Sequence, residues 1–380
     1  MGSVHKKLQV LLVGSGGIGT MVAYALEKGG KVEVAAVLRS NFEAVFDNGF
    51  TIHSVDHGEI KDWQPTSSEL CITQQVLFKF HELTITYLVL DSIPSVNKES
   101  WRAAYDYVII TTKNAPDIPP SLPDLIAPAI TPGHTAIVLI QNGLNIERPF
   151  FSAFPTNTIL SGITFMGAIE SPPGTINHHN HDRTFIGAFH NPAAGLPQKA
   201  FATALALRLM DAYSACGPNV DCTYEPDVPY SRWRKLLYNA SYNGVAAILG
   251  MDTSRMRFSE HIIDDLICPL MQEIRATAKA AAGVELEEEL IEKIITADGY
   301  DKCFKPSMLQ DVEKGKFIEF ENLVGEPLRE AERVGVKTPT LKVVYGLLKG
   351  LQFKAKERHL KEVVVPRNGE GLKYGGCVRS

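Results

Sequence analysis

The segment of residues 8–28 constrains the fold of this 380-residue chain more than any other part of the sequence. Residues 8–13, LQVLLV, form a short and almost continuous apolar run, which is typical of a parallel strand buried on both faces. The next six residues, GSGGIG at 14–19, form a glycine-rich loop, and residues 20–28 carry apolar side chains at helical spacing. The order of strand, glycine loop and helix predicts the first unit of an α/β domain.

The loop also predicts a binding site for a dinucleotide. Gly14 permits a tight turn, Gly16 lets the backbone approach a pyrophosphate, and Gly19 allows the helix to pack closely on the strand. The helix N-terminus then presents free N–H groups to the anion. A glycine loop also occurs as a plain turn, but the strand before it and the helix after it favour a Rossmann-type site. The predicted cofactor-binding residues of the loop are Gly14, Ser15, Gly16, Gly17, Ile18 and Gly19.

The residue after the second predicted strand indicates which dinucleotide binds. This strand, residues 32–38, is followed by Arg39, which lies 20 positions beyond Gly19. NAD-binding proteins usually have a carboxylate there, which accepts hydrogen bonds from the ribose hydroxyls. A guanidinium favours a 2′-phosphate instead, so the sequence predicts NADP(H). The alternative is an exposed arginine in a loop.

Two further strands of the first half end in polar residues. Residues 105–112 precede Lys113, and residues 135–140 precede Gln141-Asn142-Gly143. Open parallel sheets bind ligands at the carboxyl ends of their strands, so Lys113 and Asn142 are expected beside the cofactor. Asn-Gly often forms a hairpin turn, but an apolar strand before it and a helical pattern after it do not require one here.

A run of histidines at 178–181, HHNH, raises the question of a metal site. Consecutive residues of a strand point to opposite faces, and no cluster of carboxylates or cysteines accompanies the run. A polar hairpin is the favoured explanation, and no metal is predicted.

The second half of the chain has a helical pattern. Strand patterns end near residue 225, which predicts a domain of residues 1–225 and a second of residues 226–380. A helix expected over 231–248 carries Lys235, Asn239 and Asn243, whose spacing of four places them on one face. Asparagine is unfavourable inside a helix, so this face is a candidate site, with a solvated polar stripe as the alternative.

A second candidate cluster lies between residues 305 and 323. Ser307 follows a proline and precedes Gln310 by three positions, so it could equally form a capping box at a helix start. Glu319 is flanked by apolar residues and is expected to be a partly buried carboxylate that requires a cation, such as Lys235.

Composition excludes several classes of function. The net charge of -5 lacks the basic excess of a nucleic-acid-binding protein. The longest apolar runs are far shorter than the ~20 residues that span a bilayer, and no secretory signal is expected. The six cysteines lack paired CxxC spacing, which favours reduced thiols and a cytoplasmic protein. A small molecule is therefore the expected partner, and neither nucleic acid nor a membrane is.

Taken in order, these motifs resemble the ketopantoate reductase (2-dehydropantoate 2-reductase) family from Leu8 to about Leu348. The resemblance rests on the combination of GSGGIG at 14–19, Arg39, Thr112-Lys113, Gln141-Asn142-Gly143, KLLYNASYN at 235–243, SMLQD at 307–311 and Glu319. It implies a Rossmann-type domain followed by an all-helical domain similar to that of 6-phosphogluconate dehydrogenase, with the substrate in the cleft between them. The boundary expected near residue 226 agrees with this plan.

The resemblance also implies an activity and a role for each residue. The activity is the NADPH-dependent reduction of a 2-keto acid, first of all ketopantoate to pantoate in pantothenate biosynthesis. Lys235 corresponds to the general acid and Glu319 to the acidic partner in the catalytic site. Asn239 and Asn243 correspond to residues that orient the substrate, and Ser307 to a substrate contact. An ammonium beside the ketone can donate a proton as negative charge develops on the oxygen.

Two departures from the family pattern leave the substrate open. Arg39 and Lys113 are 74 positions apart, more than in compact bacterial members, and periodicity does not resolve the stretch 41–102 beyond candidate strands at 51–55 and 83–90. The tail after Leu348 has no counterpart in the family. The alternatives are a reductase of another branched 2-keto acid and a non-catalytic NADPH-sensing protein. A sensor, however, would not need the candidate catalytic and substrate-binding residues of the second half. A homodimer is compatible with the sequence, which does not determine the oligomeric state.

Overall fold

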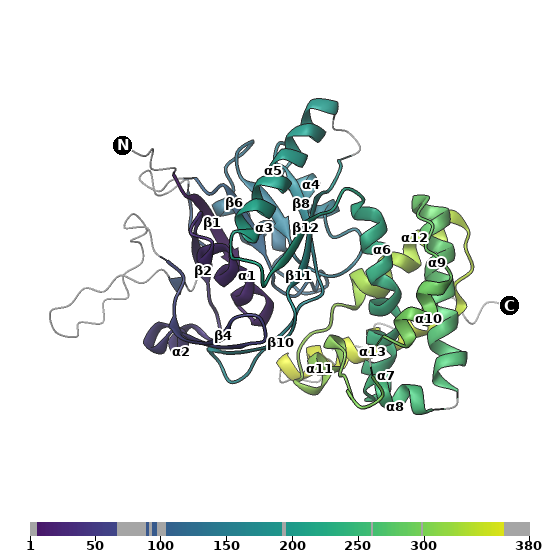
Figure 1. The fold of residues 1–380 in the computed structure, drawn as a ribbon. Coiled ribbons are helices and arrows are strands. Elements are labelled where there is room, and N and C mark those ends of the chain that lie inside the picture. Colours follow the sequence, from purple (N-terminus) through teal and green to yellow (C-terminus); the bar gives the residue numbers. More distant parts are fainter. Residues whose placement is uncertain are drawn as a thin grey trace, which may run out of the picture.

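The computed structural model describes residues 6–66, 89–90, 93–96, 104–191, 195–259, 261–297 and 299–360. The strand expected at 83–90 therefore lies outside the described residues except for β5 (Val89–Leu90), and so does the tail after residue 360. Figure 1 shows a part built around a sheet and a helical part beside it. Within the described ranges, no helix is both long and apolar enough to cross a membrane.

The first part contains an eight-stranded sheet in the order β12-β11-β8-β7-β6-β1-β2-β5. All neighbouring strands are parallel except β11 and β8, so β11 and β12 run against the other six. The strands besides β5 are β1 (Leu8–Val13), β2 (Val32–Val37), β6 (Tyr107–Ile110), β7 (Ala136–Leu139), β8 (Ile159–Thr164), β11 (Arg183–Ala188) and β12 (Asp221–Tyr224). The predicted α/β fold is confirmed.

Helices cover both faces of this sheet, as the apolar run at residues 8–13 predicts. Val10 and Leu12 of β1 enter the core beneath α1 (Gly17–Lys28) and α5 (Leu196–Ser214). Leu11 and Val13 enter the opposite core, which is closed by α3 (Leu122–Ile126), η1 (Ala127–Ala129) and α4 (Arg148–Ala153). Because alternate side chains of one strand are buried on opposite faces, the strand has no polar side.

A second, smaller sheet has the order β4-β3-β10-β9 and lies against α1. It joins β3 (Phe50–Ser54) and β4 (Gly58–Trp63), which follow α2 (Phe42–Asn48), to the hairpin of β9 (Gly167–Glu170) and β10 (Thr175–Asn180). The strand expected at 51–55 is therefore present. In β10, His178 is buried and His179 is exposed, and the His178 ring lies 2.8 Å from the Ser54 hydroxyl.

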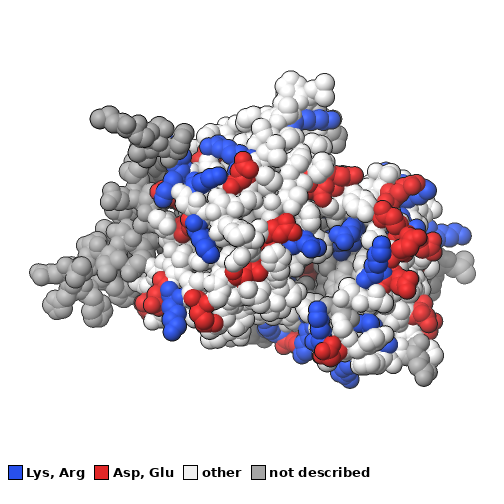
Figure 2. Space-filling view, viewed as in Figure 1, with Lys and Arg blue, Asp and Glu red and all other residues white. Residues whose placement is uncertain are grey.

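In the second part, helices are the only regular elements among the described residues, and they enclose an apolar core of their own. The expected helix at 231–248 is a continuous run of α6 (Val228–Tyr238), a π-helical turn η2 (Asn239–Asn243) and α7 (Gly244–Leu249). The remaining elements are α8 (Thr253–Phe258), η3 (Ile263–Ile267), α9 (Cys268–Ala282), α10 (Glu289–Ile295), α11 (Ser307–Glu313), η4 (Glu321–Gly325), α12 (Glu326–Val334) and α13 (Pro339–Leu360). On the face drawn in Figure 2, Lys and Arg are interspersed with Asp and Glu over both parts.

The glycine loop shows why Gly19 must lack a side chain. A Cβ atom at Gly19 would lie 1.9 Å from the Gly14 carbonyl oxygen and 2.5 Å from the Thr111 hydroxyl oxygen. A Cβ at Gly16 would meet nothing within 4 Å. Gly19 therefore lets α1 approach the strand ends, whereas Gly16 faces open space.

We expect Gly19→Ala to lower the free energy of unfolding by about 2 kcal/mol, because the start of α1 must move away from the Gly14 carbonyl and the Thr111 hydroxyl. Urea denaturation of the purified protein measures this loss. Gly16→Ala is the matched control and should cost about 0.5 kcal/mol, the scale of a changed N-cap residue. Equal losses in the two variants would contradict the close packing assigned to Gly19.

Candidate active site

The predicted cofactor loop lies where β1 ends and α1 begins. Gly14 has a φ of +106°, and its carbonyl accepts a hydrogen bond from the Thr111 hydroxyl at the end of β6. The Ser15 hydroxyl donates to the Val37 carbonyl at the end of β2. The open space at Gly16 and the free N–H groups at the start of a twelve-residue helix fit the approach of a pyrophosphate.

Arg39 lies just beyond β2 with an exposed side chain. No carboxylate in the described residues forms an ion pair with its guanidinium. Its backbone N–H donates to the Asn41 side chain (3.3 Å), and the Asn41 amide donates to the Ser15 carbonyl (2.8 Å) and the Glu170 carboxylate (2.7 Å). Asn41 is buried and links the Arg39 turn to the glycine loop and to β9. Sequence reasoning missed it, although it comes two residues after the strand-end arginine.

Lys113 and Glu319 meet between the two parts of the structure. The Lys113 ammonium lies 2.8 Å from the Asp311 carboxylate and 3.3 Å from that of Glu319. Glu319 also accepts a hydrogen bond from the backbone N–H of Asn114 at 2.8 Å. Almost half of the Lys113 side chain is exposed, but both carboxylates are buried. Burial disfavours the charged ammonium, yet Glu319 and Asp311 outweigh it and hold the pKa of Lys113 above its usual value.

This arrangement corrects one expectation. Glu319 was expected to pair with Lys235, but the cation within ion-pair distance of it is Lys113. Lys113 pairs with Glu319 in place of Lys235 for a geometric reason. The segment after β6 reaches the Glu319 carboxylate with both the Lys113 ammonium and the backbone N–H of Asn114. Glu319 still acts on Lys235 at longer range, where its charge favours the ammonium form.

Lys235 extends from α6 toward the carboxyl end of β8. Its ammonium donates to the Thr164 carbonyl at 2.5 Å and lies 5.3 Å from the centre of the Phe165 ring. Burial lowers the pKa of Lys235 to about 7, and the charge of Arg232 adds to this effect. A lysine with a pKa near neutrality can hold or release a proton under physiological conditions.

A narrow pocket lies beside this ammonium. It is lined by Gln141, Asn142, Gly143, Ile163, Arg232, Lys235, Leu236 and Asn239. The structure thus brings Asn142, Lys235 and Asn239 to one pocket. The glycine loop, Arg39, Lys113, Asn243, Ser307 and Glu319 are not among its lining residues.

The two asparagines of the π-helical turn are buried, so they do not form a solvated polar stripe. The Asn243 amide donates to the Asn239 side-chain oxygen at 3.0 Å. The Asn243 side-chain oxygen is buried and has no hydrogen-bond partner among the described residues. A buried acceptor without a donor is costly, and π-helical turns are frequent at functional sites.

Ser307 is the first residue of α11, which packs against α7 and η2. Pro306 is the N-cap residue and no side chain caps the helix, while the Gln310 amide donates to the Lys305 carbonyl at 2.8 Å. The capping-box alternative is therefore wrong. Among the described residues, the Ser307 hydroxyl has no hydrogen-bond partner.

Arg232 is a pocket residue that sequence reasoning missed. It is buried and lies three residues before Lys235 in α6. Positions three apart share a face of a helix, so the spacing could have indicated it. Arginine is common on helix surfaces, however, and the sequence gives no sign that this one is buried.

Family models cover most of the chain. Residues 10–191 match the model described as "Ketopantoate reductase PanE/ApbA", and residues 227–352 match that of its C-terminal domain. An uncharacterized protein of Saccharomyces cerevisiae is 34% identical over 370 residues, which cover 92% of this chain and 95% of that protein. A 2-dehydropantoate 2-reductase of Nostoc sp. is 24% identical over 340 residues, or 90% and 94% of the two chains.

Solved structures agree with the observed fold. The crystal structure of 2-dehydropantoate 2-reductase from Methylococcus capsulatus has a TM-score of 0.69 and 27% identity, and covers 92% of this chain and 98% of that one. A D-mandelate dehydrogenase in a ternary structure with NADH and anilino(oxo)acetate has a TM-score of 0.70 at 18% identity, with coverage of 92% and 100%, and shows the shared fold alone.

The Lys113 contacts predict a loss of stability when their cation is removed. In Lys113→Met, the buried carboxylates of Asp311 and Glu319 lose their cation, so we expect a loss of about 2 kcal/mol at pH 8. Urea denaturation of the purified variant and of the wild-type protein measures this loss.

Lys305→Met serves as the control, because it removes an exposed ion pair with Glu313 at 2.7 Å. Its effect should stay within about 0.5 kcal/mol at the same pH. A Lys113→Met loss that is equally small would show that the ion pairs across the two parts do not stabilise the fold.

Proposed function

Because the chain belongs to the ketopantoate reductase family of oxidoreductases, we propose that it reduces ketopantoate to pantoate with NADPH and that Lys235 is the general acid. Family members bind NAD(P)H and act on small keto acids. The observation that carries the proposal is the position of Lys235, whose ammonium reaches the carboxyl end of the sheet in a pocket shared with Asn142 and Asn239. Open α/β sheets bind their ligands at this edge.

The glycine loop, Arg39, Lys113 and Asn142 are proposed to hold the cofactor. Bound NADPH would supply the hydride that adds to the carbonyl carbon. Gly16 leaves room for a pyrophosphate at the start of α1. The exposed guanidinium of Arg39, without a carboxylate partner among the described residues, supports a preference for a 2′-phosphate.

Lys235 is proposed to donate the proton. As the carbonyl oxygen gains negative charge, an ammonium with a pKa of about 7 can transfer a proton to it near neutral pH. Asn239, Asn243 and Ser307 would orient the substrate by neutral hydrogen bonds. Glu319 would serve as the acidic partner through its contacts with Lys113 and the Asn114 N–H.

Several finer points stay predictions. The boundary between residues 225 and 226, a cytoplasmic location and a role in pantothenate biosynthesis belong to the proposal. So does a homodimer, which is supported by a ketopantoate reductase from Staphylococcus aureus described as dimeric. A reductase of another branched 2-keto acid is the second candidate, because the uncharacterized yeast relative leaves the substrate open.

The absorbance of NADPH, followed with a panel of 2-keto acids that includes ketopantoate, tests the reaction. Oxidation with ketopantoate alone supports the proposed substrate, and oxidation with other branched 2-keto acids supports the second candidate. No oxidation with any member would reject the reductase and favour a non-catalytic NADPH-sensing protein. Binding of NADPH, measured by fluorescence, shows whether the cofactor site is intact.

Lys235→Met should reduce kcat by about 10²–10⁴-fold, the usual contribution of a general acid, while NADPH binds normally. In the wild-type protein, kcat/KM for reduction should fall as the pH rises above about 7, because the ammonium form of Lys235 is then lost. Arg234→Met removes the exposed neighbouring cation of the same helix and should keep kcat within about twofold. Turnover close to normal in Lys235→Met would reject Lys235 as the acid.

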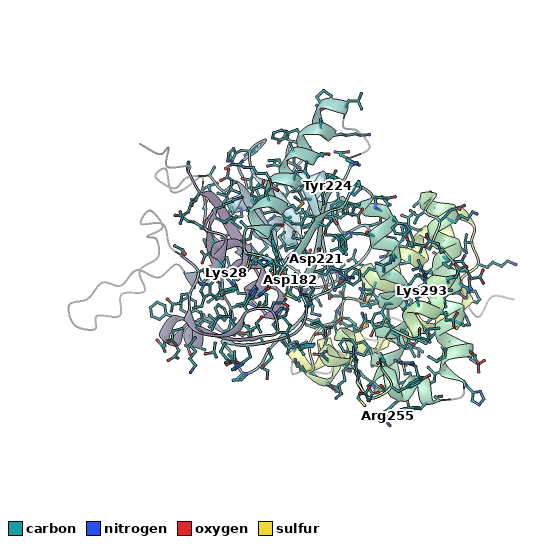
Figure 3. The ribbon with its side chains drawn as sticks, viewed as in Figure 1. Lys28, Asp182, Asp221, Tyr224, Arg255 and Lys293 are labelled. Carbon is teal, nitrogen blue, oxygen red and sulfur yellow. The ribbon has the colours of Figure 1, made fainter. Side chains whose placement is uncertain are left out.

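Arg39→Asp should weaken NADPH binding by about 10–100-fold and leave NADH binding nearly unchanged, because only the 2′-phosphate loses its cation. Arg255→Asp makes the same change of charge on α8, in the helical part (Figure 3), and should alter neither affinity. An unchanged preference in Arg39→Asp would remove Arg39 from the cofactor site.

A further inference from the structure

Arg232 is enclosed between the carboxyl end of β7 and the middle of β8, with 6% of its surface exposed. Its guanidinium donates to the carbonyls of Gln141 (2.9 Å) and Gly143 (3.1 Å), which flank Asn142. It also donates to the Ser161 hydroxyl from Nε (3.1 Å) and from Nη2 (2.9 Å). Longer contacts reach the carbonyls of Leu139 (3.3 Å) and Gly162 (3.5 Å).

These contacts use every donor of the side chain. A guanidinium has five N–H groups on three nitrogens. In Arg232, Nε donates to one oxygen of the chain itself, Nη1 donates to two, and Nη2 lies within hydrogen-bond distance of three. Its face is covered by the Phe189 ring, whose centre lies 4.9 Å away. Arg232 therefore has no donor left for a ligand, and any effect on the reaction must pass through the groups that it holds.

Its charge is not neutralised locally. Among the described residues, no carboxylate lies within ion-pair distance of Arg232. Burial lowers its pKa to about 10, against a weaker opposing effect of Glu147, so it is still a cation at neutral pH. Burial also raises the pKa of Glu147, which weakens that carboxylate as a counter-charge. The pocket therefore contains a buried positive charge next to Lys235.

The groups that act electrostatically on Lys235 come from different elements. Arg232, on the same helix, disfavours the ammonium form, and Glu319, from the segment before η4, favours it. Glu319 also forms an ion pair with Lys113, which partly neutralises the charge that Glu319 presents to Lys235. Arg234 is exposed, and its guanidinium lies 5.8 Å from the centre of the Phe165 ring.

We infer that Arg232 is a positioning residue, which clamps the strand-end segment carrying Asn142 to the helix carrying Lys235 and supplies a fixed positive charge beside the proton donor. This inference rests on the proposed function, since it concerns the same pocket. It assigns Arg232 two separable effects. The hydrogen bonds fix geometry, and the charge tunes Lys235 and favours an anionic substrate.

Three variants separate these effects from a purely structural role. Arg232→Met removes charge and clamp, Arg232→Lys keeps the charge but loses the fork of donors, and Arg234→Met is the exposed control on the same helix. The first readout is the rate at which acetic anhydride labels Lys235 in the protein without substrate, followed by peptide mass spectrometry across pH. Only the neutral amine reacts, so the midpoint reports the titration of Lys235.

In Arg232→Met the midpoint should rise by about one pH unit, because a neighbouring like charge is lost, and kcat should fall at least about tenfold. In Arg232→Lys the midpoint should stay within about 0.3 unit of wild type while kcat falls about tenfold. Arg234→Met should change neither. A wild-type midpoint in Arg232→Met overturns the inference, even in a destabilised variant.

If Arg232→Met does not fold, Arg232→Lys decides the question, because wild-type kcat in that variant overturns the clamp. Labelling needs no substrate, so it separates this inference from the proposed function. If none of the 2-keto acids in the panel supports NADPH oxidation by the wild-type protein, the proposed function is rejected. A shifted midpoint in Arg232→Met would still support the electrostatic effect of Arg232 on Lys235.

Discussion

Polar contacts between the carboxyl edge of the sheet and the helical part hold the proposed site together. Arg232 binds the carbonyls on both sides of Asn142, and Lys113 binds two carboxylates of the helical part. Leu144 and Asn322 add a pair of reciprocal hydrogen bonds, each of 2.9 Å. Because buried polar groups are costly without partners, these contacts strongly favour one arrangement of the sheet edge against the helices.

The close approach is visible in the backbone as well. Gly143 has a φ of +109°, and a Cβ atom there would lie 2.6 Å from the Cβ of Asn322. The glycine after Asn142 is therefore required by the contact between the two parts rather than by a hairpin. On the helical side, the π-helical turn at Asn239–Asn243 widens the helix where its two asparagines are buried. Both irregularities lie at the same junction.

The sequence predicted what local patterns determine and missed what depends on distant contacts. The strand at residues 8–13, the role of Gly19 and the face shared by Lys235 and Asn239 follow from periodicity and steric rules. The stretch after Asn41 was harder, because β3 pairs with β10, more than a hundred residues later. The cation of Glu319 and the burial of Arg232 depend on how the helical part meets the sheet, which no local spacing encodes.

The charge balance of the pocket gives the proposed chemistry a physical reason. Arg232 and Lys235 line the pocket together, while Glu319 is shared with Lys113 outside it. A 2-keto acid brings a carboxylate to this excess of positive charge, and a nearby anion favours the ammonium form of Lys235. The pKa of Lys235, about 7 in the free protein, would then rise when substrate binds. On the proposed function, the acid would thus be most fully protonated when a substrate is present to receive the proton, and a neutral ketone would not produce this effect.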